Sequence, residues 1–323
     1  MTNEPEFTYD HDAVLDDAAL GKQPSAKYLE IVDMVDNVVR ECMYVSRSYA
    51  GINSPTARHY YASVLFTAMI TKGVSLANLM PFTPWAEKRI EHWDYASVAG
   101  ITRTMLELRL AFYYLCVDSC DQDEWDCRWN VFNLHDCTSR IRLFDAIGGD
   151  EAEQLKAQAE EIKNRLRSNS HFITQVQSLQ KRLMNSQTAY MKPLEDIAEQ
   201  TGMERATFRW MYIFLSSHVH ALPMSFYRLG EERGRGLPTP VEEGYTSICL
   251  AQAANFLVQT RDDVHMLFSE FKERASEIIK RESSSSISSE QPIQAEGMAV
   301  GDSKILTETD SIAVEVTMTS ANE

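Results

Sequence analysis

The sequence has few glycines and prolines for its length and no long alternation of apolar and polar residues. It contains 13 glycines and 10 prolines among 323 residues. A half-buried strand needs a period of two, whereas apolar residues in this chain recur every three or four positions. The sequence therefore argues against a β-rich fold and predicts an all-α bundle of six to eight helices.

The sequence also lacks the short motifs that bind nucleotides or metal ions. It has no Walker phosphate loop, no Rossmann glycine fingerprint and no Glu-x-x-His pair of the kind that holds a di-iron centre. Cysteines and a histidine gather in the middle of the chain without any Cys-x2-Cys pair, which favours buried thiols over zinc. No metal ion and no cofactor is therefore expected. The residues that raise the zinc question are Cys116, Cys120, Cys127, His135 and Cys137.

Positive charge is in deficit, because 31 Lys and Arg face 47 Asp and Glu, for a net charge of -16. Residues 1–26 carry -5 and residues 282–323 carry -7, which leaves only -4 for the rest. Acidic ends argue against a broad nucleic-acid surface. A local basic groove is the alternative to a plain solvated helix face, and it would use Arg165, Arg167, Lys181 and Arg182.

No targeting or membrane segment is expected. The first residues, MTNEPEFTYDHD, lack the positive and apolar regions of a signal peptide, which predicts a cytoplasmic protein. Six cysteines in a chain of this length indicate reduced thiols. Residues 210–227 and 244–260 contain no Asp, Glu, Lys or Arg, but polar residues within both runs favour buried helices over membrane spans.

Composition divides the chain into three parts. We expect a mobile acidic arm over residues 1–26, a single helical domain over 27–281 and a disordered, Ser-rich acidic tail over 282–323. Apolar periodicity and breaker residues predict the helices inside the domain. They are expected at about 27–49, 57–80, 85–117, 125–147, 151–183 with a break near 167–171, 203–229 and 245–281.

Residues 203–229 are apolar nearly all round, which predicts a central, buried helix. Ser216 and His220 lie one turn apart in it, and Arg103 and Glu107 lie one turn apart in another apolar helix. Buried polar groups need partners, so we expect these four side chains to meet in a buried cluster. They are the candidate catalytic or ligand-facing residues. The alternative is an exposed ion pair between Arg103 and Glu107.

The two segments that hold these residues, RTMLE from Arg103 and YIFLSSHVH from Tyr212, resemble a bacterial family of uncharacterised all-helical proteins. Its pattern is Arg-x3-Glu followed by Tyr-x2-Leu-Ser-x3-His. The resemblance covers about residues 85–270 and implies the fold and a shared polar centre, without an established chemistry. A looser likeness to HEPN-type domains is also noted, although the Arg-x4-6-His spacings at 165–171 and 128–135 are as frequent as chance allows.

These observations predict an interaction or accessory protein, bound to a protein partner or to a second copy of itself, in a role such as stress response or phage defence. Whether the chain is an enzyme stays open. The alternative is a metal-independent, HEPN-like RNase in which His220 moves protons and Arg103 stabilises phosphate charge.

Overall fold

The computed structural model describes residues 23–88, 91–148, 151–227 and 240–271, all of them within one compact unit. These ranges hold eleven α-helices, one π-helix and one 3-10 helix, and no strand. The all-α prediction is confirmed, with a helix count above the expected six to eight. The expected C-terminal tail and nearly all of the N-terminal arm lie outside the described residues.

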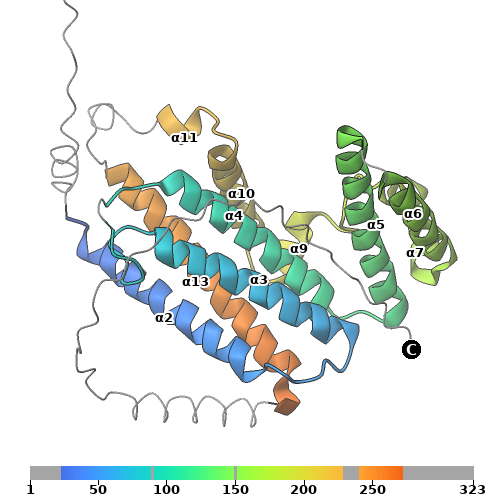
Figure 1. Ribbon diagram of the computed structural model, residues 1–323, viewed down its shortest axis with the longest axis horizontal. Helices are drawn as coiled ribbons and strands as arrows, with labels where there is room; N and C mark the ends of the chain where they lie inside the picture. The colour runs from blue at the N-terminus through green and yellow to red at the C-terminus, as the bar shows by residue number, and fades with distance from the viewer. Residues whose placement is uncertain (1–22, 89–90, 149–150, 228–239, 272–323) are drawn as a thin grey trace, which may run out of the picture. The chain divides into compact units, whose positions relative to one another are not determined.

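Four helices form the main core. They are α2 (Ala26–Ser48), α3 (Ala57–Leu79), α4 (Tyr95–Phe112) and α13 (Pro240–Leu267). Helix α13 packs against the other three, although it follows them by more than a hundred residues in the chain (Figure 1). Gly73 allows this close packing, because a Cβ there would lie 3.0 Å from Leu257 Cδ1 and 3.1 Å from Val39 Cγ2.

Helix α4 begins at Tyr95 and not near Trp85, so the expected helix over 85–117 is shorter at its start. The preceding segment is held by side chains that satisfy backbone groups elsewhere. Lys88 Nζ donates to the carbonyl oxygens of Leu79 at 2.8 Å and Met80 at 2.7 Å, at the C-terminal end of α3. Asp94 then caps α4 by accepting from the Ser97 backbone amide at 3.1 Å.

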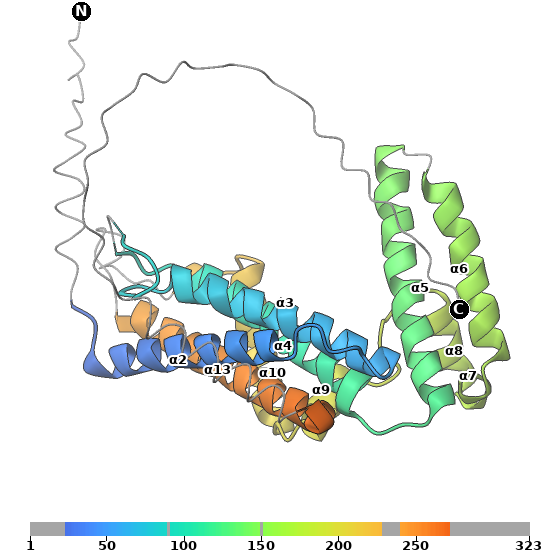
Figure 2. The same ribbon diagram turned by 60° about the horizontal axis from the view of Figure 1, so that its bottom comes forward.

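A second, smaller core lies between helices α5 to α8. After the π-helix η1 (Tyr113–Val117), α5 (Gln122–Ile147) pairs with α6 (Glu151–Ser168), followed by α7 (Ser170–Thr174) and α8 (Gln177–Met184). Figure 2 shows these four helices as a group beside the main core. The expected break near 167–171 occurs where Asn169 caps α7 by accepting from the Phe172 amide at 2.8 Å.

The segment expected as one central helix is divided and lies at the edge of the main core. Helix α9 (Leu194–Gln200) leads into α10 (Arg205–Val219), which packs on α4, and α11 (Met224–Tyr227) follows after a break. Phe208, Met211 and Leu215 are buried, but the opposite side of α10 is exposed. An apolar outer face, which the sequence pattern cannot distinguish from a buried one, explains the difference. The chain described ends in the short helix η2 (Ser269–Phe271).

Among the described residues, α3 is the one helix long and apolar enough to meet the criteria for a membrane span, with a mean hydropathy of 1.3 in its best window. A core helix meets the same criteria, and the inner face of α3 is buried against α2, α4 and α13. The uncharged run 210–227 is interrupted after Val219.

Candidate functional site

Arg103 joins α4 to α10. Its Nε donates a hydrogen bond to Ser216 Oγ at 3.2 Å, and its guanidinium carbon lies 4.0 Å from the centre of the Tyr212 ring. Tyr212 and Ser216 are one turn apart on α10, so one arginine contacts two successive turns of that helix. We call Arg103, Glu107, Tyr212 and Ser216 the Arg103 cluster. It brings together residues from both sequence motifs.

Glu107 lies at the open side of this cluster. Its Oε1 is 2.7 Å from Arg103 Nη1, but its side chain is 50 % exposed, against 12 % for Arg103. The buried Nη1 makes this ionic contact without hydrogen-bond alignment. The prediction of a fully buried cluster is therefore wrong for Glu107, and the alternative of an exposed pair describes this carboxylate better.

The His220 side chain is exposed, and no described side-chain contact connects it to the Arg103 cluster; only its backbone amide donates to Ser216 O, at 3.1 Å. Helix α10 ends at Val219, and Ala221 has a left-handed backbone with φ of 49°. The backbone amide of Leu222 donates to Ser217 O at 3.0 Å and that of Ala221 to His218 O at 3.2 Å, the two bonds of a Schellman motif. This ending places His220 at the C-cap and turns its side chain toward solvent.

The buried histidine of α10 is His218, which the sequence did not single out. It is 4 % exposed, and its Nδ1 is 2.7 Å from Phe214 O. Its ring lies 4.4 to 5.6 Å, centre to centre, from the rings of Phe214, Tyr95 and Tyr245. Its Nε2 is buried without a hydrogen-bond partner in the described part of the chain. The sequence contains a signal for the burial of His218, because this residue lies at helical spacing from the apolar residues Met211 and Phe214, which are also buried.

A second buried ion pair links α4 to α13. Arg109 Nη1 contacts Asp263 Oδ2, and Arg109 Nε donates to Gln259 Oε1 at 3.2 Å. Both charged side chains are almost fully buried. Because each charge is compensated and the amide adds a further acceptor, this pair fits a structural link between two core helices.

Arg128 of α5 is buried and hydrogen-bonded through all three of its guanidinium nitrogens. Its guanidinium donates to Tyr114 O at 2.6 Å, to Asp118 Oδ2 at 2.8 Å and to Glu124 Oε1. Tyr114 belongs to the π-helix, whose widened turn leaves carbonyl oxygens in need of donors. Arg128 supplies one of these donors and thereby fixes α5 to the end of α4.

The contacts of the Arg103 cluster fit a role in holding two helices together better than a role in proton transfer. Its one cation is already engaged by an aromatic ring, a hydroxyl and a carboxylate, and Ser216 donates to no described base. Within the described ranges, no group of three or more His, Cys, Asp and Glu side chains is placed to hold a metal ion. The cluster is therefore suited to positioning α10 on α4.

A family model matches residues 59–237, more than half of the chain, and its description is family of unknown function (DUF5677). The chain belongs to this family. Searches of the curated proteins and of the solved structures gave no match. The DUF5677 match spans α3 to α11 and contains both sequence motifs, but it leaves out α2 and α13 of the main core. The expected resemblance to an uncharacterised all-helical family is confirmed at this level, while its motifs and the HEPN likeness stay predictions.

Proposed function

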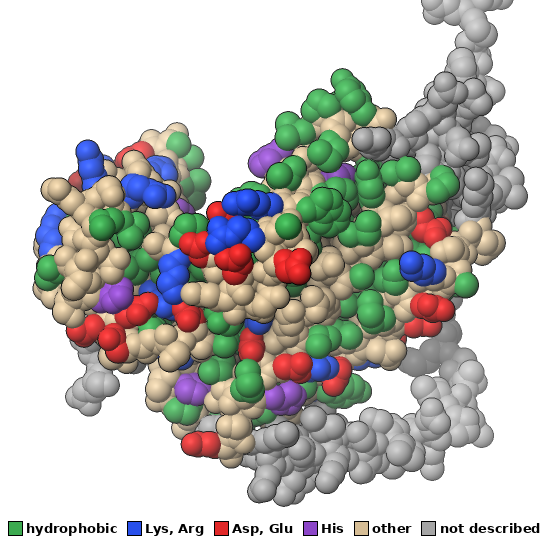
Figure 3. All heavy atoms as spheres, turned by 180° about the vertical axis from the view of Figure 1, so that it is seen from behind, with side chains coloured by type: hydrophobic (Ala, Val, Ile, Leu, Met, Phe, Trp, Pro, Cys, Tyr) green, Lys and Arg blue, Asp and Glu red, His purple; other side chains and the backbone are tan. Residues whose placement is uncertain are grey.

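We propose that this DUF5677 protein is a cytoplasmic interaction protein that pairs with a second copy of itself through the outer side of α10 and α11. One observation carries the proposal: seven large apolar side chains are exposed within 18 residues. Figure 3 shows hydrophobic side chains gathered over this part of the molecule. We call this surface the α10–α11 face. It consists of Trp210, Ile213, Leu222, Met224, Phe226 and Tyr227, whereas the seventh, Val219, lies beside Gly100 of α4.

Exposed apolar side chains are ordinary when they are single, but a contiguous group of them favours a binding surface. Ile213 is 60 % exposed and Tyr227 is 74 % exposed. The ring of Trp210 is stacked on Phe214, with centres 5.4 Å apart, so it lies flat against its own helix. An aromatic side chain that is already ordered loses little conformational entropy on binding, as is typical of interface residues.

The Arg103 cluster supports this function by holding α10. Arg103 is bonded to Ser216 and packed on Tyr212, both on the side of α10 that faces α4. Trp210 and Ile213 lie on the other side. The polar motif and the apolar face therefore share one helix, with the first fixing the orientation of the second.

A second copy of the chain is the partner that the charges around this face fit. Arg205 and Arg209 of α10 form ion pairs with Glu195 and Glu199 of α9, so charges of both signs lie next to Trp210. A two-fold interface places the same patch against itself, and a border that carries both signs is self-complementary in that arrangement. A border of a single sign would favour a partner of opposite charge instead.

The test is the mass of the full-length protein by analytical ultracentrifugation at micromolar concentrations. We expect a dimer for the wild type and a monomer for Ile213→Glu, because a charge in an apolar interface is costly to desolvate. Leu143→Glu on α5 is the matched control, since Leu143 is an aliphatic residue of similar exposure outside this face. A monomeric wild type, or a dimer that Ile213→Glu leaves intact, contradicts the proposal.

The RNase alternative has less support, because Arg103 is engaged on three sides and His220 is not among its contacts. We expect the purified protein to leave RNA intact over hours. Cleavage that disappears in His220→Ala, with an unchanged circular dichroism spectrum, would instead establish the RNase. A role in stress response or phage defence stays a prediction that gene neighbourhood can test.

A further inference from the structure

One stretch of this acidic chain combines many cations with the absence of any acid. Residues 162–194 include no Asp or Glu, in a protein whose net charge is -16. The same stretch contains six Lys and Arg together with His171. It covers the C-terminal half of α6, all of α7 and α8, and the segment that leads to α9. A local positive field in an otherwise negative molecule points to an anionic ligand.

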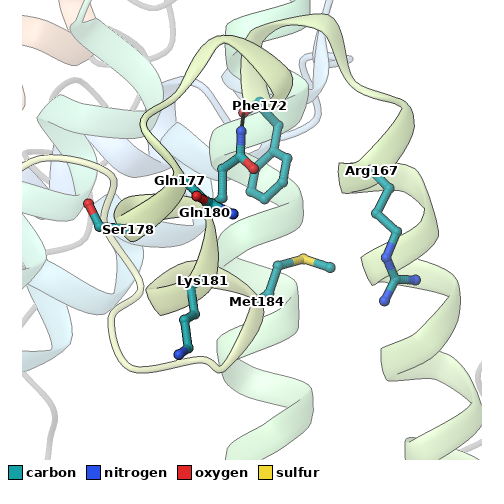
Figure 4. Close-up of a pocket in the computed structure, with 7 residues that line it drawn as sticks. All are labelled: Arg167, Phe172, Gln177, Ser178, Gln180, Lys181 and Met184. Carbon is teal, nitrogen blue, oxygen red and sulfur yellow. Dashed lines mark hydrogen bonds between the residues drawn. The ribbon is translucent and has the colours of Figure 1, made fainter.

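This stretch lines an open surface hollow of about 670 Å³ between α6 and α8. Figure 4 shows Arg167 on α6 at one side and α8 at the other, where Met184 extends toward Arg167 and Lys181 points away from it. Phe172 of α7 contributes an apolar base that is itself buried. We call this hollow the α6–α8 groove. Its volume lies within the range of sites that hold a small ligand or one unit of a polymer.

The groove is held in shape by the connection between α7 and α8. Gln180 Nε2 donates to the carbonyl oxygens of Phe172 at 3.1 Å and Gln175 at 2.9 Å, and therefore fixes the turn that leads into α8. Gln177 and Ser178, which also line the groove, are exposed and form no side-chain hydrogen bond within the described chain. Their amide and hydroxyl groups are thus available to donors and acceptors of a ligand.

The cations around the groove are only partly neutralised. Arg167 is bonded to Asn164 at 2.6 Å and lies 3.9 Å from Glu160, which pairs more closely with Lys163. Lys181 has no ion-pair partner among the described residues, and neither have Arg165 and Arg182 nearby. Three further acids outside the stretch contact it: Asp123 accepts from Ser170, Glu124 lies 4.0 Å from His171 and Asp118 pairs with Lys192 at 3.2 Å.

We propose that the α6–α8 groove binds a single strand of nucleic acid. Arg167 and Lys181 contact the phosphates, Gln177 and Ser178 meet a base edge, and Met184 covers an apolar part of the base. The amide groups select an unpaired strand, because a duplex exposes base edges only inside its grooves. A duplex also needs a broader basic surface than this chain offers. The site is distinct from the α10–α11 face.

The experiment uses full-length protein and a fluorescein-labelled oligouridine of about twelve nucleotides at about 50 mM salt, read by fluorescence anisotropy. We expect saturable binding that weakens about tenfold or more in Lys181→Glu and in Arg167→Glu. The matched control is Lys156→Glu, which makes the same charge change on α6 outside the groove. We expect less than about a twofold effect for it. Circular dichroism confirms that each variant is folded.

Absence of saturable binding, or equal losses in Lys156→Glu and Lys181→Glu, overturns the proposal. Two competitors identify the class of ligand. If polyglutamate displaces the oligouridine as well as unlabelled oligouridine does, the groove binds acidic polypeptide instead. If uridine monophosphate does so, the ligand is a free nucleotide. We expect neither to compete, and a slope of log Kd against log salt of about 1.4, or about 0.7 for each of two phosphates.

Discussion

At the scale of single residues, the Arg103 cluster is asymmetric. The arginine is almost buried and bonded across two helices, whereas Glu107 contributes one contact from a half-exposed position. Because solvent screens the Glu107 carboxylate, its removal costs the Arg103 charge little electrostatic stabilisation. Removal of the arginine loses a charge-assisted hydrogen bond together with the packing of its stem against Tyr212.

We therefore expect Glu107→Ala to lower the free energy of unfolding by about 0 to 1 kcal/mol. Arg103→Ala is expected to lower it by about 1.5 to 3 kcal/mol. Urea unfolding followed by circular dichroism compares the two variants directly. Equal losses, or a larger loss for Glu107→Ala, would show that the carboxylate is the more deeply held partner after all.

Arg128 gives the larger expected effect. Arg128→Met removes the donor shared by Asp118, Glu124 and a carbonyl of the π-helix, so we expect a loss of about 3 to 5 kcal/mol. The control is Arg140→Met on the same helix, where an exposed pair with Asp136 at 3.7 Å predicts a loss below about 1 kcal/mol. Urea unfolding measures both, and similar losses would contradict a structural role for Arg128.

The sequence allowed part of the candidate site to be predicted. Polar interruptions in two apolar stripes indicated that Arg103 and Ser216 meet, which the 3.2 Å bond confirms. Exposure could not be predicted, because it depends on which helix lies over each side of α10. The spacing favours His220 over His218, because His220 lies one turn after Ser216 in a continuous helix. Helix α10 instead ends at Val219, before Pro223, and Ala221 takes a conformation that usually belongs to glycine.

At the scale of elements, two glycines in core helices have opposite surroundings. A Cβ at Gly73 would press on α13 and α2, whereas one at Gly244, inside α13, would meet nothing within 4 Å. Alanine is the better helix former by about 1 kcal/mol, but overpacking costs about 1 to 3 kcal/mol. We expect Gly244→Ala to raise the melting temperature and Gly73→Ala to leave it unchanged or lower it. A clear rise for Gly73→Ala would contradict tight packing at this position.

The observed ends of two core helices agree closely with those predicted from the apolar periodicity of the sequence. The ends of α2 and α3 lie within two residues of the predicted positions, because local apolar spacing and the Ser25 cap determine them. The start of α4 differs from the prediction, because side-chain-to-backbone bonds hold the segment before it: Lys88 donates to Leu79 O, and Glu91 accepts from the Phe82 amide. Tertiary partners of this kind leave no periodic signal in the sequence.

At the scale of the whole molecule, buried thiols make the free energy of unfolding depend on pH in the alkaline range. Burial raises the pKa of Cys42, Cys116, Cys127 and Cys249 from 9.0 to about 12. The unfolded chain ionises at the lower pKa, so this contribution is fully present below pH 9 and is lost as the pH rises from 9 toward 12. The slope that one such thiol gives is at most about 1.4 kcal/mol per pH unit over this window.

We expect the free energy of unfolding to be level between pH 7 and about 8.5 and to fall steeply by pH 10. Burial also raises the pKa of Tyr28 and Tyr114, which steepens the fall above pH 10. Urea unfolding at successive pH values checks this expectation. The slope should be smaller in Cys249→Ala, and a pH-independent free energy of unfolding would show that solvent reaches these thiols.

The position of α13 also bears on how the protein is synthesised. Glu243 accepts from the Ser25 amide at 3.3 Å and Arg261 binds Glu41 at 2.6 Å, across 218 and 220 residues of chain. A ribosome that adds about 5 to 20 residues per second needs roughly 10 to 45 s to proceed from the end of α2 to the end of α13. During this interval the apolar stripes of α2, α3 and α4 have no fourth helix to cover them. Nascent chains of this protein are therefore expected to be bound by a chaperone until α13 has emerged.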